Sequence, residues 1–504
     1  MAVIGIDLGT TFSAVAYIDD IGRPVILRDS EGQNITPSCV TEANGRIVVG
    51  RNAQIKSLIE LDDPKNEGRA GARFKRLMGH SETHQVGTQT LTPTELSTLV
   101  LKKLAHIAQT QLGEVTEAVV TIPANFAHEA REATLQAARK AGLNVRSIIN
   151  EPTAAALFYA HEKQSSLHGH YAVFDLGGGT FDVSIINING ENVDVKASSG
   201  VSRLGGDDFD IALTDVVARK FEQQVGSPME PDDFGREDAE ILKKALSTME
   251  ATEARVGRRD FIQVTRSEFE EEISGLLAQV QMHCESALEE AGLAPSDVNG
   301  VFMAGGSCRV PAVRKIAQKA FNQEPVETAN LDEVVALGAA LYSASKADKA
   351  SLNPAQSRAV SGIGLNEIAA YCFGTLSIGV DRATGQQEMQ NSVLIKKGDA
   401  IPCKVTETFY TVANDQRNVA LTVTSCTTPE TDPDFTETIW EGNLPLPPGR
   451  PEGQEIQVSF SIDDNGSMHC HFKDVASGQF QEVDINESIK KEMKESEVEA
   501  FQVD

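Results

Sequence analysis

The spacing of apolar and polar positions changes along the chain near residue 346. Before it, apolar runs such as 3–7 and 117–123 predict strands. They alternate with segments of helical spacing such as 92–113 and 128–142. After it, short segments of two-residue period, separated by turn residues, predict an all-β region. The pattern predicts an α/β domain over 1–346, a linker over 347–375, a β domain over 376–486 and a short charged tail over 487–504.

Several helix ends can be placed from capping signals. Thr92 and Glu95 have capping-box spacing, and Gly113 follows the last apolar position of the same segment. The same spacing from Ser267 to Glu270 predicts one long helix over 267–292. A further helix is expected over 236–254.

Composition and net charge limit the kinds of molecule that the protein is expected to bind. The 504 residues carry 45 Lys and Arg against 73 Asp and Glu, a net charge of −28. This balance argues against binding to duplex nucleic acid or to an anionic membrane, and it suits basic or apolar polypeptides. The seven cysteines form no CxxC pair, so we expect reduced thiols and a cytoplasmic protein. Neither a signal peptide nor a membrane span is expected.

The candidate ligand-binding residues lie in a short sequence motif that occurs twice, here called the repeated phrase. DLGTTFS at 7–13 returns as DLGGGTFDVS at 175–184, and each copy places an aspartate at the end of a strand, then a tight turn and a second strand. Glycine turns let backbone amides approach an anion, and Thr10, Thr11 and Thr180 add hydroxyls. An aspartate beside polyphosphate is understandable if it holds magnesium through water. The pair therefore predicts a nucleoside triphosphate site, while Walker and dinucleotide motifs are absent from the sequence.

Three weaker signals accompany it. AGGSCRVP at 304–311 supplies Gly305 and Gly306, and LGGDDFD at 204–210 supplies Gly205 and Gly206; each alone is more typical of a loop than of a site. Glu240, Lys243 and Ser247 share one helix face, and from spacing alone a solvated face is favoured.

Taken together, these motifs resemble the heat shock protein 70 family of DnaK-type chaperones. The resemblance runs through FKRLMG, TIPANF, IINEPTAAAL and DEVVALGAAL in the first domain, and through LSIGV and VSFSIDDNGSMHCHFKD in the second. It implies an actin-like ATPase domain, a duplicated ribonuclease H-like fold, followed by a β-sandwich that binds substrate. It also implies a short member without the family's C-terminal helical lid.

The resemblance assigns roles residue by residue. Lys75 would position the γ-phosphate and the attacking water, and Glu151 would help to hold hydrated magnesium. The catalytic set would be Asp7, Lys75, Glu151, Asp175 and Thr180, and the metal set Asp7, Glu151, Asp175 and Asp182, with magnesium mostly through water and potassium directly. ATP or ADP would contact Gly9, Thr10, Thr11, Gly177, Gly178, Gly179, Gly205, Gly206, Glu240, Lys243, Ser247, Gly305, Gly306, Ser307, Arg309 and Asp332. Pro123 and Arg131 would relay nucleotide state, and Ile378, Val380, Phe409, Val412, Val419 and Leu421 would line a peptide groove.

The implied function is slow ATP hydrolysis coupled to transient binding of extended apolar segments of unfolded polypeptides. A J-domain co-chaperone and a nucleotide-exchange factor are the implied partners, and a monomer is expected. One alternative is a regulatory protein that binds ATP and acts on another chaperone or on the ribosome. A small-molecule kinase is a third reading, for which the β domain leaves little room.

Overall fold

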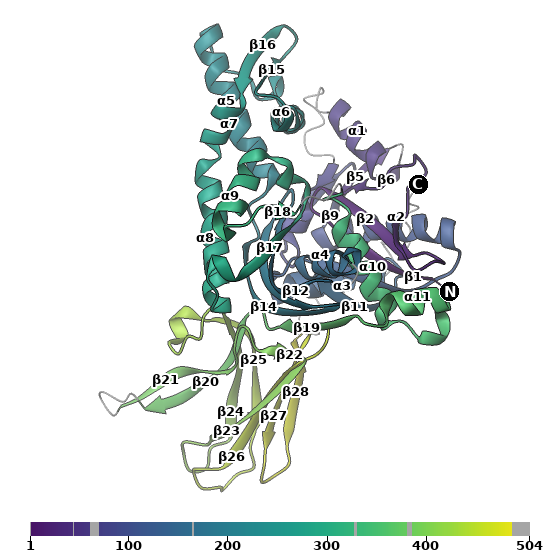
Figure 1. The fold of residues 1–504 in the computed structure, drawn as a ribbon. Coiled ribbons are helices and arrows are strands. Elements are labelled where there is room, and N and C mark those ends of the chain that lie inside the picture. Colours follow the sequence, from purple (N-terminus) through teal and green to yellow (C-terminus); the bar gives the residue numbers. More distant parts are fainter. Residues whose placement is uncertain are drawn as a thin grey trace. The chain divides into compact units, whose positions relative to one another are not determined.

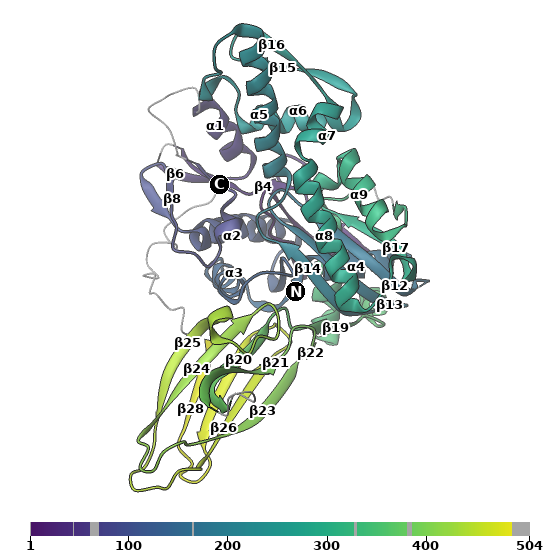
Figure 2. The same ribbon diagram turned by 90° about the vertical axis from the view of Figure 1, so that its left-hand side faces the viewer.

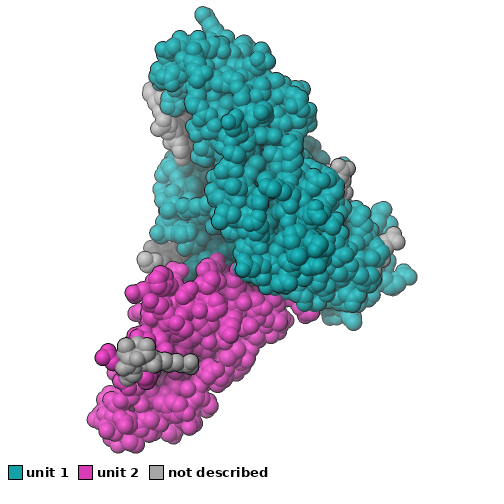
Figure 3. Space-filling view, turned by 60° about the vertical axis from the view of Figure 1, so that its left-hand side comes forward, with its two compact units in different colours: residues 1–365, 494–504 teal, residues 366–493 magenta. Residues whose placement is uncertain are grey.

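A computed structural model describes residues 2–43, 45–60, 70–163, 166–326, 330–380 and 386–485. These residues divide into two compact units, one up to Leu365 and the other from Asn366 (Figure 3). The tail predicted over 487–504 lies outside the described residues.

The first unit is mixed α/β, and two of its sheets share one topology (Figure 1). In the first sheet the order is β11-β10-β1-β2-β3, with β1 antiparallel to β2 and parallel to β10. In the second the order begins β18-β17-β12-β13-β14, with β12 antiparallel to β13 and parallel to β17. The strands of the first sheet are β1 (Ala2–Asp7), β2 (Phe12–Ile18), β3 (Pro24–Ile26), β10 (Val115–Ile122) and β11 (Val145–Asn150), with β4 (Thr36–Pro37) paired to β2. Those of the second are β12 (His168–Leu176), β13 (Phe181–Asn189), β14 (Asn192–Val201), β17 (Val298–Ala304) and β18 (Pro325–Val326). The two copies of the repeated phrase thus occupy equivalent hairpins, β1–β2 and β12–β13.

Two alanine-rich helices join these sheets. α10 (Val334–Lys346) packs on β1 and β2, α4 (Glu151–Glu162) packs on β12 and β13, and the two helices contact each other. Their approach is very close, since a Cβ on Gly338 would fall 1.7 Å from the carbonyl oxygen of Ala154. Small side chains at this contact are therefore required by the fold.

The remaining elements of this unit complete two subdomains. Figure 2 shows α5, α6 and α7 gathered with the hairpin β15–β16. Near the first sheet lie α1 (Arg51–Glu60), β5 (Cys39–Ala43), β6 (Arg46–Val49), β7 (Ala70–Ala72), β8 (His84–Val86), β9 (Gln89–Leu91), α2 (Pro93–Leu112) and α3 (His128–Lys140). With the second sheet come α5 (Gly206–Val225), α6 (Arg236–Thr248), β15 (Ala251–Val256), β16 (Asp260–Thr265), α7 (Arg266–Glu272), α8 (Ser274–Ala291) and α9 (Pro311–Phe321).

Some predicted helix ends are confirmed and others are corrected. Thr92 caps α2 through the expected capping box, and Gly113 ends it. The prediction of a single helix over 267–292 is wrong. α7 begins directly after β16, at the capping box of Thr265 and Glu268, and a separate helix, α8, begins after Ile273. Both boxes have the same spacing, so spacing alone could not choose between them.

The helix expected over 236–254 is also too long. α6 ends at Thr248, and the next residues form β15, which pairs antiparallel with β16. Ala254 and Val256 are buried while the residue between them is exposed. Burial therefore alternates with the two-residue period of a strand and does not follow the period of a helix.

Ordered structure occupies part of the stretch 347–375 that composition indicated to be a linker. α11 (Pro354–Val360) begins at a capping box of Asn353 and Gln356, and Val360 is buried in the first unit. Gln356 donates a hydrogen bond to the carbonyl of Ile18 at 2.9 Å. Pro354 thus stands in the first turn of a helix, where its missing amide hydrogen costs no hydrogen bond. Strand β19 (Gly364–Ile368) follows, and β20 begins at Cys372 rather than at 376.

The second unit is a β-sandwich. One sheet has the order β21-β20-β24-β25 and the other β23-β26-β27-β28, while β22 (Ala400–Ile401) pairs with β19. Phe460 and Phe472 of the second sheet are buried in the same core as Val423 and Leu444 of the first. The strands are β20 (Cys372–Val380), β21 (Gln387–Ile395), β24 (Asn418–Cys426), β25 (Glu437–Pro445), β23 (Cys403–Tyr410), β26 (Glu455–Ile462), β27 (Met468–Asp474) and β28 (Phe480–Asp484).

Across the described ranges, no helix has the length and apolar character needed to cross a membrane.

Candidate functional site

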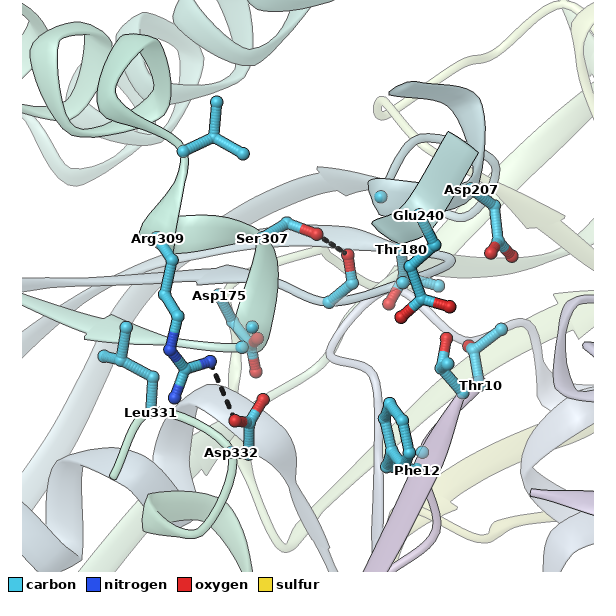
Figure 4. Close-up of a pocket in the computed structure, with 18 of the residues that line it drawn as sticks. Thr10, Phe12, Asp175, Thr180, Asp207, Glu240, Ser307, Arg309, Leu331 and Asp332 are labelled. Atoms are coloured by element: carbon cyan, nitrogen blue, oxygen red, sulfur yellow. Dashed lines mark hydrogen bonds and ion pairs between the residues drawn. The ribbon is translucent and has the colours of Figure 1, made fainter. Parts of the chain in front are cut away.

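A cavity of about 820 Å³ in the first unit collects the chemistry that the sequence singled out. Both repeated turns reach it, and Figure 4 shows Arg309 and Asp332 on one side and Thr10 and Glu240 on the other. The lining includes Asp7, Gly9, Thr10, Thr11, Lys75, Glu151, Asp175, Gly177, Gly178, Thr180, Gly206, Glu240, Lys243, Ser247, Gly305, Gly306, Ser307, Arg309 and Asp332. Gly179, Gly205 and Asp182 belong to the same segments without lining the cavity.

Backbone contacts build the second turn. The amides of Gly206 and Asp207 donate to the carbonyls of Gly177 and Gly178 at 3.0 and 2.8 Å, and Ser307 Oγ donates to the carbonyl of Gly177 at 2.8 Å. A Cβ on Gly178 would fall 1.9 Å from Thr11 Oγ1, so the two turns meet where only glycine fits. Three glycine segments far apart in sequence therefore form one continuous cradle.

The first turn is held differently. Ser13 Oγ accepts from the amide of Gly9 at 3.2 Å, and Ser38 Oγ donates to the carbonyl of Gly9 at 2.8 Å. The two hydroxyls also contact each other at 2.9 Å. This network leaves Thr11 Oγ1 buried and without a hydrogen-bond partner in the described structure. A buried hydroxyl in this state fits a bound ligand that supplies the missing partner.

Four carboxylates, three of them buried and one half-buried, lie around the ammonium group of Lys75. Lys75 pairs with Glu151, Asp7 accepts a hydrogen bond from Thr121 at 3.0 Å, and Asp182 accepts from the side chain of Asn125 at 3.0 Å. Asp175 completes the group; Lys75, Glu151, Asp175 and Asp182 are buried, and Asp7 is half-buried.

Burial and mutual repulsion weaken ionisation in this cluster. Desolvation, reinforced by the charge of Glu151 and opposed by that of Lys75, raises the pKa of Asp7 to about 7. Desolvation and Glu151 likewise raise the pKa of Asp182 to about 7, and the same causes hold the pKa of Asp175 well above its usual range. A site with this excess of buried negative charge is chemically suited to a cation.

The donor set fits hydrated magnesium. Within the described residues, no three carboxylate, histidine or cysteine side chains converge closely enough to ligate one ion directly. Magnesium retains several waters and takes only one or two carboxylates in most sites, so an outer-shell arrangement is compatible with these side chains. The glycine cradle beside them leaves room for phosphate oxygens.

A further wall of the cavity is built by α6 and by the loop after β17. Lys243 donates to the carbonyl of Gly206 at 2.8 Å and pairs with Asp210 at 2.7 Å, so it is buried and the solvated-face interpretation of Lys243 is wrong. Arg309 pairs with Asp332 at 2.7 Å (Figure 4). Gly305 has a φ of 83°, in the left-handed region, and a Cβ there would meet the carbonyl of Leu176 at 2.3 Å.

Several lining residues escaped the sequence analysis. Phe12, Asp207, Asp210, Lys244 and Leu331 are the most prominent of them. Four of the five are next to a predicted site residue in the sequence. Only this proximity could have identified them, because these residues form no motif themselves.

Two arginines also connect the two sides of the cavity at the phosphate end. Arg73, whose φ of 58° is left-handed, donates to Asp207 at 2.7 Å, and Arg76 pairs with Asp208 at 2.5 Å. No periodicity or motif marked Arg73.

The predicted relay and groove residues are not among those that line this cavity. Pro123 is buried after β10, and Arg131 is half-buried on α3. In the second unit, Ile378, Val380 and Val412 are exposed at 46%, 61% and 49%. Phe409 and Val419 are half-buried, and Leu421 is buried in the sandwich core.

Comparison with protein families agrees with this geometry. The family model described as Hsp70 protein matches residues 3–504, which is nearly the whole chain. The match covers both the unit with the cavity and the β-sandwich. The chain belongs to the Hsp70 protein family.

Proposed function

We propose that this protein is a slow ATPase that couples hydrolysis of ATP to ADP and phosphate with transient binding of extended apolar polypeptide segments. The family is one of ATP-dependent chaperones in general. The observation that carries the proposal for this chain is the cavity, where the two repeated turns meet and Asp7, Glu151 and Asp175 line the wall together with the buried Lys75.

The residues at the phosphate end would divide the work. Asp7, Glu151, Asp175 and Asp182 would hold hydrated magnesium, which when bound neutralises charge on phosphate oxygens. The amides of the glycine cradle and the hydroxyls of Thr10, Thr11 and Thr180 would bind the phosphates.

Lys75 would orient the attacking water and stabilise the developing charge. Its partner Glu151 keeps the ammonium group in place at the cavity wall. The described cavity offers no histidine and no carboxylate separate from the metal set and the ion pairs, so catalysis would depend mainly on positioning. Slow turnover is the expected result, which suits a timer of binding rather than a metabolic enzyme.

The β-sandwich would supply the polypeptide site. Ile378 and Val380 expose apolar side chains on β20, and Val412 does so after β23. Extended peptides are commonly held by backbone hydrogen bonds, with apolar pockets selecting side chains. We further propose cooperation with a J-domain co-chaperone and a nucleotide-exchange factor, and action as a cytoplasmic monomer.

Single-turnover ATP hydrolysis, measured with and without a leucine-rich peptide, tests the coupling. Faster hydrolysis or altered ADP release with the peptide supports it. Equal rates together with normal ATP binding would contradict coupling and favour a regulatory protein that acts on another chaperone or on the ribosome.

Lys75→Ala tests the assignment within the cavity. We expect ATP binding to persist and hydrolysis to fall by about 10²–10³-fold, as when a main electrostatic stabiliser of an active site is lost. Lys315→Ala, which removes a mostly exposed lysine on α9 paired with Glu270, is the matched control and should hydrolyse at the normal rate. Normal hydrolysis by Lys75→Ala would overturn the role of Lys75.

A further inference from the structure

We propose that Cys372 and Cys426 are a site of oxidative modification, at which hydrogen peroxide converts two thiols into one disulfide within the β-sandwich. The two residues are direct partners in the antiparallel pairing of β20 with β24. Both are buried free thiols, and besides burial the thiol of Cys426 contributes to the raised pKa of Cys372. Cross-strand partners have Cβ atoms about 4.5–5.5 Å apart, within a small adjustment of the separation of about 3.5–4.5 Å that a disulfide requires.

The remaining cysteines of this unit provide a contrast. Cys403 lies opposite Ile462, and Cys470 lies between Phe460 and Val483. Neither has a thiol as its register partner. Of the four cysteines in the second unit, the pairing of strands therefore presents only Cys372 and Cys426 to one another.

The cysteine pair lies at the short stretch of pairing between β20 and β24, here called the joint. β20 and β24 are paired only where Cys372–Gly374 meet Thr424–Cys426. By contrast, β20 pairs with β21 from Phe373 to Val380, along nearly its whole length. The pairing of β24 with β25 is equally extensive. A disulfide at the joint would cross-link the two hairpins where they are held by the fewest pairs.

The chemistry needs an oxidant and a sulfur able to react. A thiolate of Cys372 attacks hydrogen peroxide, which gives a sulfenic acid and hydroxide; the thiol of Cys426 then displaces hydroxide from that sulfur to form the S–S bond. In total, two thiols and one peroxide give one disulfide and two waters. The backbone amide of Lys397 donates to Cys372 Sγ at 3.2 Å, a contact that favours the thiolate, although burial raises the pKa of Cys372 in the closed sheet.

Access comes from the ends of the strands. Cys372 is the first residue of β20 and Cys426 the last of β24, and the residue after Cys426 is exposed. Strand ends open locally at much lower free energy than the whole domain. Oxidation is therefore expected to be slow and to report on opening of this joint.

The test uses the full-length protein treated with excess hydrogen peroxide, then alkylated and digested without reductant. Mass spectrometry should find the peptide containing Cys372 joined to that containing Cys426, with the loss of two hydrogens and release by dithiothreitol. Cys372→Ser and Cys426→Ser should each abolish the link, and Cys403→Ser is the matched control that should retain it. Because the mapping is first done on the unaltered protein, poor folding of a variant would not obscure the outcome.

A second measurement examines the consequence for stability. The link closes a loop of more than 50 residues, so the oxidised β-sandwich should unfold at a midpoint higher by at least about 5 °C. Full alkylation of both thiols after peroxide treatment, or a link from either thiol to Cys403 instead, would overturn the proposal. An unchanged or lowered midpoint would contradict the placement of the link at an unstrained joint.

Discussion

The two equivalent hairpins of the first unit make the same turn by different means. In β1–β2 the turn contains Thr10 and Thr11, and serine hydroxyls from neighbouring segments hold Gly9. In β12–β13 the turn is three glycines in succession, held by the backbone amides of Gly206 and Asp207 and by the hydroxyl of Ser307. The strands, their order and the terminal aspartates are equivalent, while the turns are not. A duplicated framework can therefore keep its strands and their order while the turn itself changes, from a pair of threonines in one copy to three glycines in the other.

The largest difference should appear when a methyl group is added to the second turn. Gly178→Ala puts a Cβ within 1.9 Å of Thr11 Oγ1, so the Thr11 side chain must rotate away or the turns must separate. We expect a loss on the order of 3 kcal/mol in ATP binding, about 100-fold in Kd, because either response displaces a hydroxyl or amides from the proposed phosphate site. Calorimetric titration with ATP and magnesium measures it.

Gly177→Ala is the matched control for folding. A Cβ at this neighbouring position meets no atom within 4 Å. Its thermal unfolding should match that of the unaltered protein, whereas that of Gly178→Ala should be lowered. Equal unfolding of the two variants would contradict the tight meeting of the turns.

Next in size is a pH effect on the metal-free protein. Asp7 has a folded-state pKa of about 7 against an ordinary value of 3.8, so the folded protein binds more protons than the unfolded chain between those values. Ionisation of Asp7 therefore lowers stability as pH rises from about 4 to about 7, and the loss then stays constant. Asp7→Asn should be more stable than the unaltered protein by roughly 2–4 kcal/mol at pH 8 and nearly equal to it at pH 4.

Denaturant unfolding at several pH values in the presence of a chelator measures this effect. Asp182→Asn extends the test to the other hairpin, because the pKa of Asp182 is also about 7. A difference in stability that does not change with pH would refute the buried negative cluster as the cause.

A smaller effect separates ligand binding from folding in the first turn. Thr11→Val keeps the shape but removes a buried hydroxyl that has no partner in the described structure. Stability should stay equal or rise, while ATP affinity should fall by about 1 kcal/mol, the usual worth of one hydrogen bond. Ser13→Ala, which removes support from Gly9, should instead lower the unfolding free energy by about 1 kcal/mol. A loss of stability in Thr11→Val would remove the role of its hydroxyl as a ligand contact.

The smallest effect is expected at the far end of the cavity. Arg309 is nearly half exposed and pairs with Asp332 across solvent-accessible space. Arg309→Ala should weaken ATP binding only a few-fold, since exposed ion pairs contribute about 0–1 kcal/mol. Hydrolysis of ATP once bound should be unchanged in a single-turnover assay. A change in that rate would connect Arg309 to the phosphate end.

Sequence information was strongest where geometry forces a residue type. Glycines that would clash as alanine, and aspartates at strand ends, repeat in both halves, so the site could be assembled before the fold was known. The sequence was least informative where two local signals of equal strength predict different element boundaries. Thr265 and Ser267 offer identical capping spacing, and only pairing of β16 with β15 selects the first. Asn353-Pro354 indicates a linker in composition and a helix start in context. Arg73 could not be found at all, because its importance depends on a partner 134 positions away.

The close contact between α4 and α10 has a mechanical consequence. Gly338 lies against the backbone of Ala154, so at this point no side chain separates the two helix backbones. Any larger residue at position 338 would force α4 and α10 apart. Because these helices pack on the two sheets that carry the repeated turns, the spacing between the sheets depends on the absence of a single methyl group.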